Sequence, residues 1–332
     1  MSIPGDEVAG KVVLEIKDLH VTFPIGFEGQ EVEILRGISL QLPEGGVLGL
    51  VGESGSGKSM LLLSVLGLLP GRGQISKGSI LLDDEDLCTV SAPRLRLIRG
   101  GSIGTIFQDP MTSLNPVRRI GSLLVETLHR HRSIDRKKAK VVALEALREV
   151  GVPSPKERIR AYPHELSGGL RQRVMIAHAL LNQPRVILAD EPTTALDTTT
   201  QLQILSLLKT RVKNASILFI THDLGVASEL CDEIAVLYAG RVVERGPTAQ
   251  VLENPRHPYT VGLIAAMPHF TRNREPLKVI LGEPMRLTGV VTGCAFVARC
   301  ERALAKCQTE DPFLQSVDES VHVACWNQLE TS

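Results

Sequence analysis

Hydrophobic and polar residues alternate in two long stretches near the start of the chain. The alternation runs over residues 12–23, as in "LEIKDLHVTF", and over residues 31–42, and a shorter piece, "GSILLDD", follows Lys77. A period of two residues is typical of strands that have one face in contact with solvent. The three segments therefore predict an antiparallel patch of sheet near the start of the chain.

Three other segments are hydrophobic almost throughout. They are "GVLGLV" at residues 46–51, "VILAD" at residues 186–190 and "SILFIT" at residues 216–221. Such runs are typical of parallel strands that are covered on both faces. Helix-like segments lie between them, at residues 58–69, 136–150, 170–181 and 200–212. Strands that alternate with helices predict an α/β fold, to which the antiparallel patch is added.

The same patterns divide the chain into parts. Residues from about 110 to 183 show little strand character and contain a proline break at "VPSPKE", so we expect a helical subdomain inserted between two strands of the core. After about Pro255 the proline density rises and both periods fade. The sequence therefore predicts a main domain over residues 1–255 and a separate C-terminal piece over residues 256–332.

Composition and charge exclude several classes of protein. The chain has 332 residues, of which 43% are hydrophobic, so it can bury a sizeable core. Lys plus Arg equals Asp plus Glu at 37 each, which gives no overall field that would attract nucleic acid or an anionic membrane. The start does not resemble a signal peptide, and the longest apolar run, residues 60–70, is about half of a membrane span. We expect a cytoplasmic protein that binds no nucleic acid.

One glycine-rich segment predicts a nucleotide site. The sequence "GESGSGKS" fits the phosphate-loop pattern, follows a buried strand and opens an apolar helix, which is the context that the pattern requires. Backbone N–H groups would surround the phosphates, Lys58 would reach the β- and γ-phosphates, and the Ser59 hydroxyl would ligate Mg²⁺. The alternative is a chance glycine-rich turn. The predicted ATP-binding residues of the loop are Gly52, Glu53, Ser54, Gly55, Ser56, Gly57, Lys58 and Ser59.

Two adjacent carboxylates follow the strand "VILAD". Asp190 ends the strand and can hold the metal, and Glu191 comes next in "DEPTTALD". A carboxylate at a strand tip is suited to polarise the water that attacks the γ-phosphorus. The alternative is that Glu191 begins a solvated loop, but its position directly after Asp190 favours a catalytic base.

The ordered set of motifs resembles the nucleotide-binding subunit of an ATP-binding cassette (ABC) transporter. The set consists of the phosphate loop, Gln108 in "FQDP", "LSGGLRQR", "VILADEPTTALD" and His222 in "ITHD". The segments "FQDPMTSLNP" and "NPRHPYT" are similar in sequence to those of the dipeptide and oligopeptide importer subfamily, some of whose members transport nickel. The resemblance implies a P-loop NTPase core of the RecA-like type, with an antiparallel β subdomain, an inserted helical subdomain and a small cysteine-containing C-terminal region.

The resemblance also implies a role for the serine and glycines of "LSGGL". In the family two subunits pack head to tail, so the signature residues Leu166, Ser167, Gly168 and Gly169 of one chain face the γ-phosphate held by the other. A helix start with free N–H groups suits an arriving anion. The alternative is an ordinary helix N-cap at Ser167. Leu170 departs from the family, where many members have glutamine.

Four further roles are implied by the resemblance. Gln108 would ligate Mg²⁺ and pass the state of the γ-phosphate to the membrane subunit through "DPMTSLNP". Asp197 would lie at the dimer contact, and His222 would bind the γ-phosphate and Glu191. Phe23 would stack on adenine, although a phenylalanine in an alternating strand is more often part of the core.

Four of the six cysteines lie near the C-terminal end. Cys294, Cys300, Cys307 and Cys325 are separated by five, six and seventeen residues. Zinc sites usually contain two cysteines two to four residues apart, while four thiolates also suit an iron–sulfur cluster. The spacing leaves both open, together with four reduced cysteines that pack a small core. The resemblance implies a 4Fe–4S cluster on these four residues, although Ala298 stands where relatives commonly have proline.

These inferences predict the ATPase subunit of an importer for dipeptides or oligopeptides, with ATP and Mg²⁺ as cofactors. The resemblance implies a second ABC ATPase subunit, more often a paralogue, two integral membrane permease subunits and an extracytoplasmic substrate-binding protein. It places the chain at the cytoplasmic face of the inner membrane. Alternatives are transport of nickel or another small solute, or a non-transport ABC ATPase. A chromosome-associated ATPase would have a long heptad insertion, and a translation-associated one would have two phosphate loops. A nucleotide kinase or switch protein would not need the signature residues.

Overall fold

The computed structural model describes residues 10–25, 30–194, 196–211, 215–267 and 280–330. They form two compact units. Unit 1 consists of residues 1–42, 47–88 and 219–332, and unit 2 of residues 43–46 and 89–218. The expectation that the start does not resemble a signal peptide rests mostly on residues 1–9, which lie outside the described residues.

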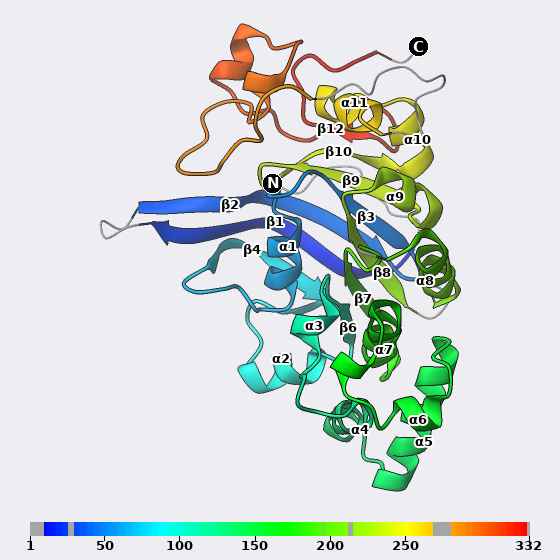
Figure 1. Ribbon diagram of the computed structural model, residues 1–332. Coiled ribbons are helices and arrows are strands. Elements are labelled where there is room, and N and C mark those ends of the chain that lie inside the picture. Colours follow the sequence, from blue (N-terminus) through cyan, green and yellow to red (C-terminus); the bar gives the residue numbers. More distant parts are fainter. Residues whose placement is uncertain (1–9, 26–29, 195, 212–214, 268–279, 331–332) are drawn as a thin grey trace. The chain divides into compact units, whose positions relative to one another are not determined.

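Unit 1 contains the predicted antiparallel sheet. Its strands are β1 (Val12–Ile25), β2 (Gln30–Pro43), β4 (Gln74–Leu82) and β5 (Glu85–Asp86), in the order β2-β1-β4-β5. β1 pairs with β4, and β4 with β5, in antiparallel fashion. Figure 1 shows β1 and β2 as long blue arrows. The alternating pattern therefore identified β1, β2 and β4 but not the two-residue strand β5, and the pairing of β1 has register shifts between Lys17 and His20 and between His20 and Val21.

The second sheet of unit 1 carries the phosphate loop. The hydrophobic strand β3 (Val47–Val51) is buried throughout and runs parallel to β9 (Glu233–Tyr238). The order continues from β9 to β10 (Arg241–Pro247), β12 (His322–Val323) and β11 (Gln315–Ser316), in antiparallel pairs. The strand β8 (Ser216–Thr221) begins in unit 2 and ends in unit 1.

The helices of unit 1 are short. They are α1 (Lys58–Val65), α9 (Leu224–Leu230), α10 (Thr248–Glu253) and α11 (Pro258–Ala265), with 3-10 turns at Val297–Arg299 and Ala305–Gln308. The prediction placed the end of α1 at residue 69, but the helix ends at Val65. Gly67 has a φ of 58°, a left-handed conformation that stops a helix at low steric cost.

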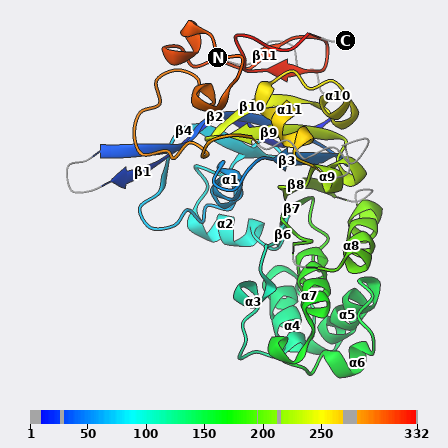
Figure 2. The ribbon, with the colours of Figure 1, turned by 45° about the horizontal axis from the view of Figure 1, so that its top comes forward.

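The C-terminal segment packs on the other elements of unit 1. β12 pairs with β10, and Asp311 forms ion pairs with Arg36 of β2 and with Arg241 of β10. Figures 1 and 2 show α11 beside β10, with the last part of the chain, in orange and red, on the same side. The cysteine-containing segment is thus built into the unit that holds the phosphate loop.

Unit 2 contains two parallel strands and most of the helices. β6 (Ile103–Ile106) pairs with β7 (Val186–Asp190). The helices are α2 (Ala92–Ile98), α3 (Pro110–Ser113), α4 (Ile120–His131), α5 (Arg136–Glu149), α6 (Pro155–Arg158), α7 (Gly168–Leu180) and α8 (Thr198–Arg211), with a 3-10 turn at Pro163–Glu165. Residues 110–183 are all described and contain no strand, as expected from their composition.

Helices α4, α5 and α7 form the helical part of unit 2. Leu124 and Leu128 of α4 and Ala143 and Leu147 of α5 are buried. These pairs are spaced by four residues, which places each pair on one face of its helix, and burial of a leucine side chain contributes about 2 kcal/mol. Asp135 caps α5 by accepting hydrogen bonds from two backbone N–H groups. None of the helices that the structure describes has the length and hydrophobicity needed to cross a membrane.

Candidate functional site

The phosphate loop joins β3 to α1 and has the backbone that its glycines predict. Gly52, Gly55 and Gly57 have φ angles of 154°, 80° and 111°, which residues with a side chain rarely adopt. A Cβ on Gly52 would lie 2.2 Å from the carbonyl oxygen of Leu237. The loop therefore requires glycine for its conformation and for its close approach to β9.

Lys58 lies at the start of α1 and is almost fully buried. Its Nζ donates hydrogen bonds to the carbonyl oxygens of Gly52 (2.7 Å) and Glu53 (2.9 Å). The ammonium group is thus held inside the curve of the loop, while Ser54, Gly55 and Ser59 are exposed. An exposed rim around a positive charge is suited to receive phosphates.

The Glu53 residue of the loop is held by groups that come late in the chain. Its backbone N–H donates to the Tyr259 hydroxyl (2.9 Å), and its carboxylate forms a bidentate ion pair with Arg299. Neither partner was expected from the sequence. The only signal was their position among the residues that resemble the peptide importer subfamily.

The two carboxylates after β7 have different environments. Asp190 is the last residue of the strand and is 7% exposed. Glu191 has a φ of 45°, and the left-handed conformation costs a non-glycine residue about 1 kcal/mol. Unusual backbone conformations of this kind are concentrated at functional sites.

Gln108 and Glu191, which the sequence places 83 residues apart, lie in contact within unit 2. Gln108 Nε2 donates a hydrogen bond to Glu191 Oε2 at 3.0 Å, and Thr194 Oγ1 donates to the same oxygen at 2.9 Å. The carboxylate therefore has a fixed orientation. Gln108 and Glu191 were expected from the sequence, but Thr194, which follows Glu191 by three residues in the same loop, was not.

The helix that follows the signature residues is connected to this loop. Gln172 of α7 is buried, and its Nε2 donates to the carbonyl oxygen of Pro192 (2.5 Å). Gln172 lies within "LSGGLRQR", but no role for it was expected from the sequence. Because Pro192 follows Glu191 directly, this bond ties the position of α7 to that of the candidate base.

The signature residues form an exposed helix start. Ser167 is the N-cap residue of α7, but its side chain makes no capping hydrogen bond. Ser167 and Gly168 are exposed, Leu166 is buried, and a Cβ on Gly168 would meet no atom within 4 Å. The first N–H groups of a 13-residue helix are thus open to an anion from outside. The geometry does not support an ordinary serine cap.

Asp197 and His222 lie in different units. Asp197 accepts hydrogen bonds from the Thr200 backbone N–H (2.9 Å) and hydroxyl (2.8 Å) at the start of α8, and these bonds lower the pKa of its carboxyl. His222 follows the end of β8 in unit 1 and is exposed. The next residue, Asp223, caps α9 by accepting from the N–H groups of Gly225 and Val226.

Phe23 lies near the end of β1 and is half-buried. A Cβ on Gly73 would lie 2.4 Å from Phe23 Cζ, so the ring packs against the Gly73 backbone. The Phe23 position therefore depends on a glycine that leaves room for the ring. Stacking on adenine stays a prediction.

The predicted magnesium ligands are all oxygen donors. Ser59 offers a hydroxyl, Asp190 a carboxylate and Gln108 an amide oxygen, and hard oxygen ligands are those that Mg²⁺ prefers. Since the Gln108 nitrogen faces Glu191, the amide oxygen remains as the end available to a cation. Each of the three donors suits Mg²⁺ by its chemistry, and their joint ligation of one ion stays a prediction.

The four C-terminal cysteines do not form a metal centre. In the part of the chain that the structure describes, no three His, Cys, Asp or Glu side chains are grouped so that they could hold a metal ion. The prediction of a 4Fe–4S cluster on Cys294, Cys300, Cys307 and Cys325 is therefore wrong. Burial raises the pKa of Cys294 to about 11 and also raises the pKa of Cys300 and Cys325. Because the thiolate is the form that ligates metals, these environments favour the neutral thiol.

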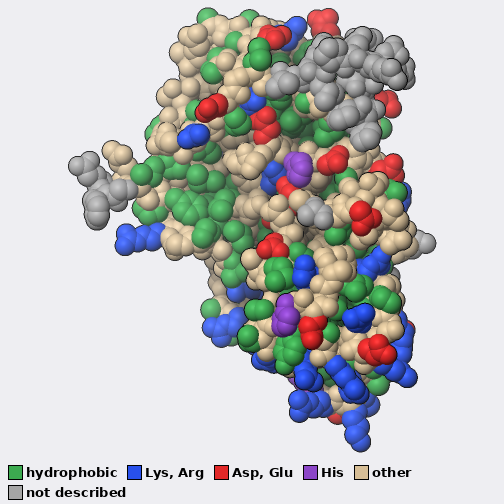
Figure 3. Space-filling model, viewed as in Figure 1, with side chains coloured by type: hydrophobic (Ala, Val, Ile, Leu, Met, Phe, Trp, Pro, Cys, Tyr) green, Lys and Arg blue, Asp and Glu red, His purple; other side chains and the backbone are tan. Residues whose placement is uncertain are grey.

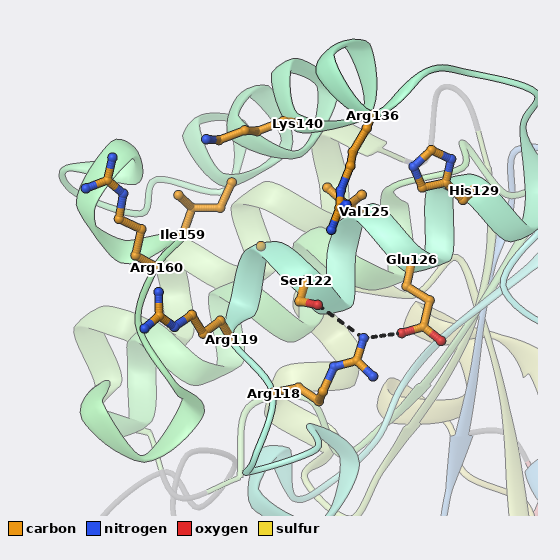
Figure 4. A pocket seen from close by; sticks show the side chains of 11 residues that line it. Arg118, Arg119, Ser122, Val125, Glu126, His129, Arg136, Lys140, Ile159 and Arg160 are labelled. Atoms are coloured by element: carbon orange, nitrogen blue, oxygen red, sulfur yellow. Dashed lines mark hydrogen bonds and ion pairs between the residues drawn. The ribbon is translucent and has the colours of Figure 1, made fainter.

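A basic pocket of about 620 Å³ lies in the helical part of unit 2 (Figure 4). It is lined by α4, by the two residues before it, by α5 and by the segment after α6, and five of its lining side chains are cationic. These are Arg118, Arg119, Arg136, Lys140 and Arg160. The one carboxylate, Glu126, accepts from Arg118 at 2.6 Å. Figure 3 shows Lys and Arg side chains gathered over α5 and α6, so this surface is suited to an acidic partner.

Two family models match the chain. Residues 35–194 match the ABC transporter model, and residues 243–307 match the C-terminal region of oligopeptide/dipeptide transporters. The first match contains the phosphate loop, Gln108, the signature residues and Glu191. The second contains Tyr259 and Arg299 together with three of the four C-terminal cysteines.

Relatives with curated descriptions match over almost the whole chain. The "Probable D,D-dipeptide transport ATP-binding protein DdpD" of Escherichia coli is 46% identical over 95% of this chain and 96% of its own length. The oligopeptide transport ATP-binding protein OppD of Bacillus subtilis is 44% identical over 95% and 88%, and the dipeptide transport ATP-binding protein DppD of the same organism 43% over 95% and 95%.

A solved structure supports the fold. The dimeric post-hydrolysis state of the ATP-binding cassette MJ0796, bound to ADP and Pi, has a TM-score of 0.64 and 30% sequence identity. It covers 71% of this chain, and 98% of that cassette is matched. The predicted fold, a P-loop NTPase core with antiparallel and parallel sheet, is confirmed.

Proposed function

Since the chain belongs to the ABC transporter ATP-binding proteins, in the group that includes the dipeptide and oligopeptide transport proteins, we propose that it is the ATP-hydrolysing subunit of a peptide importer. The observation that carries the proposal is the match of residues 243–307 to the C-terminal region of oligopeptide/dipeptide transporters. The three relatives described above are named for peptide transport. We place the boundary of this C-terminal region at residue 256, after the nucleotide-binding domain.

The roles of the site residues follow from their chemistry. The loop from Gly52 to Ser59 binds the phosphates of ATP, with Lys58 as its cation, and Ser59, Gln108 and Asp190 are the ligands for Mg²⁺. Bound Mg²⁺ neutralises charge on the phosphates. Glu191 polarises the attacking water, and the Gln108 and Thr194 bonds fix the direction of its carboxylate.

Three further residues act in the assembled protein. His222 binds the γ-phosphate, Asp197 lies at the contact with the second ATPase subunit, and Phe23 stacks on adenine. The exposed start of α7, with Ser167 and Gly168, binds the γ-phosphate held by that second subunit. The solved cassette that resembles this chain is a dimer, which supports an arrangement of this kind.

The importer requires other subunits. We infer a second ABC ATPase, most simply a paralogue, two integral membrane permeases and an extracytoplasmic substrate-binding protein. The chain then acts at the cytoplasmic face of the inner membrane. The basic pocket between α4 and α5 contacts an acidic cytoplasmic segment of a permease.

Uptake experiments test the proposal. A strain that lacks this chain should lose uptake of labelled dipeptides or tetrapeptides and regain it with the intact chain but not with Lys58→Ala. Purified transporter in vesicles should hydrolyse ATP faster when the binding protein and peptide are added. Uptake of nickel instead of peptide, or failure to purify with membrane subunits, would contradict the peptide importer.

A further inference from the structure

The second residue of the phosphate loop forms a bidentate ion pair with the C-terminal region. Arg299 Nη1 and Nη2 donate to the two carboxylate oxygens of Glu53 at 2.7 and 3.0 Å, although the residues are 246 positions apart. The Arg299 side chain is 4% exposed and that of Glu53 26% exposed. Bidentate guanidinium–carboxylate pairs are directional and strong, especially where water has little access.

Arg299 is itself fixed by its surroundings. Its Nε donates to the carbonyl oxygen of Leu281 at 3.2 Å, and its guanidinium lies 5.9 Å from the centre of the Tyr238 ring and 5.8 Å from that of Phe296. These contacts fix the guanidinium so that its two Nη groups point toward the Glu53 carboxylate. Arg299 therefore holds the Glu53 side chain in one orientation.

The C-terminal region holds the loop at a second point. The Tyr259 hydroxyl of α11 accepts from the backbone N–H of Glu53 at 2.9 Å, and the Tyr259 ring packs against Phe296 with centres 5.4 Å apart. Lys58 Nζ donates to the carbonyl oxygen of the same residue. The Ser56 backbone N–H also donates to that oxygen, at 3.2 Å. Every polar group of Glu53 thus has a protein partner, and two of the four partner residues, Tyr259 and Arg299, lie in the C-terminal region.

We propose that Arg299 is a positioning residue of the nucleotide site, which fixes Glu53 and cancels its negative charge so that the phosphate loop can accept a polyanion. The inference rests on the proposed role of this loop in binding ATP. A carboxylate within a phosphate-binding loop would otherwise repel the phosphates, and in a partly buried site such repulsion is weakly screened. The C-terminal region of the peptide-transport group then contributes directly to nucleotide affinity.

The test measures binding and turnover separately. The dissociation constant for MgATP is measured on the full chain, and KM and kcat on the assembled transporter, for Arg299→Ala, Arg299→Lys and Glu53→Gln/Arg299→Ala. Arg302→Ala is the matched control, since Arg302 lies in the same region but is exposed and donates to Asn327. Lys58→Ala tests the assignment of the loop independently.

Arg299→Ala should raise the dissociation constant and KM for ATP at least about tenfold, with kcat nearly unchanged, because the unpaired carboxylate repels the phosphates. Arg299→Lys keeps the charge but loses one of the two hydrogen bonds, so its constants should lie between those of Arg299→Ala and the unchanged chain. Removal of both charges in the double variant should restore most of the affinity. Arg302→Ala should bind ATP as the unchanged chain does.

Two results would overturn the role of Arg299. One is unchanged ATP affinity in Arg299→Ala, and the other is a double variant that binds no better than the single one, which is the result expected if Arg299 only stabilises the fold. If Arg299→Ala does not fold, Arg299→Lys and the double variant decide. Normal ATP binding by Lys58→Ala would instead overturn the assignment of the loop, so the two failures are distinguishable.

Discussion

Gln108 donates a hydrogen bond of 3.0 Å to the carboxylate of Glu191. Glu191 directly follows β7, and Gln108 comes shortly after β6, the parallel neighbour of β7. The carboxyl ends of parallel strands meet at one edge of a sheet, so the two side chains arrive at the same place from distant parts of the sequence. The hydrogen bond orients the carboxylate, and it ties the candidate base to the residue proposed to ligate Mg²⁺.

Glu191→Gln should lower kcat at least about 100-fold while the dissociation constant for ATP stays the same, because an amide cannot take a proton from the attacking water. Gln keeps the shape and can still accept the bonds from Gln108 and Thr194. Steady-state phosphate release and equilibrium binding of MgATP provide the two measurements. Thr194→Val serves as the control, since it removes one donor and leaves the base. Normal hydrolysis by Glu191→Gln would exclude this residue as the base.

The exposed start of α7 gives a second prediction. A side chain fits at Gly168, where a Cβ would meet no atom within 4 Å, so substitution there leaves the fold intact. Gly168→Asp should reduce turnover of the assembled dimer about 100-fold, because its charge repels the γ-phosphate held by the second subunit.

Gly168→Ala adds the Cβ without the charge and should retain most of the activity. ATP binding to the isolated chain should be the same for both variants, because the signature residues act on the nucleotide of the other subunit. A loss of ATP binding in the isolated Gly168→Asp chain would show that these residues serve their own nucleotide instead.

The basic pocket gives a third prediction, on association with the membrane subunits. Arg136 and Lys140 line it from one face of α5, four residues apart (Figure 4). The double variant Arg136→Glu/Lys140→Glu should lose copurification with the permeases, since it reverses the charge that an acidic segment would meet. The matched control is Lys137→Glu/Lys156→Glu, which changes the same net charge at residues that do not line the pocket. Equal copurification of both variants would exclude the pocket as the docking surface.

The sequence was sufficient wherever a signal is local. The phosphate loop, the strand that ends at Asp190 and the start of α7 are each encoded within about ten residues, and the structure has them where the pattern predicts. A short apolar run such as "EIAVLY" of β9 carries no such signal, because periodicity over six residues does not separate a strand from a buried helix. That strand was not predicted.

Contacts between distant segments could not be predicted from the residues alone. Arg299 and Glu53 are 246 positions apart, so their contact depends on how the whole intervening chain folds. The sequence around each residue does not indicate the other as its partner. The error on the cysteines has a different cause. Their spacing left zinc, a cluster and reduced thiols open, and the 4Fe–4S cluster was taken from the resemblance; the described residues contain no such metal-binding group, and burial favours the neutral thiol in this region.

His257 gives a prediction on pH. It is buried, its Nδ1 accepts from the Tyr259 backbone N–H at 3.0 Å to cap α11, and burial lowers its pKa from 6.5 to about 3. Between these values the unfolded chain binds a proton that the folded chain does not, so the free energy of unfolding should fall by about 5 kcal/mol as pH falls through this window. Urea unfolding at several pH values measures the slope. His257→Asn keeps a cap acceptor without the titration and should reduce this slope. The control is His129→Asn, at an exposed position, which should leave the slope as it is. An unchanged slope in His257→Asn would assign the acid sensitivity to other groups.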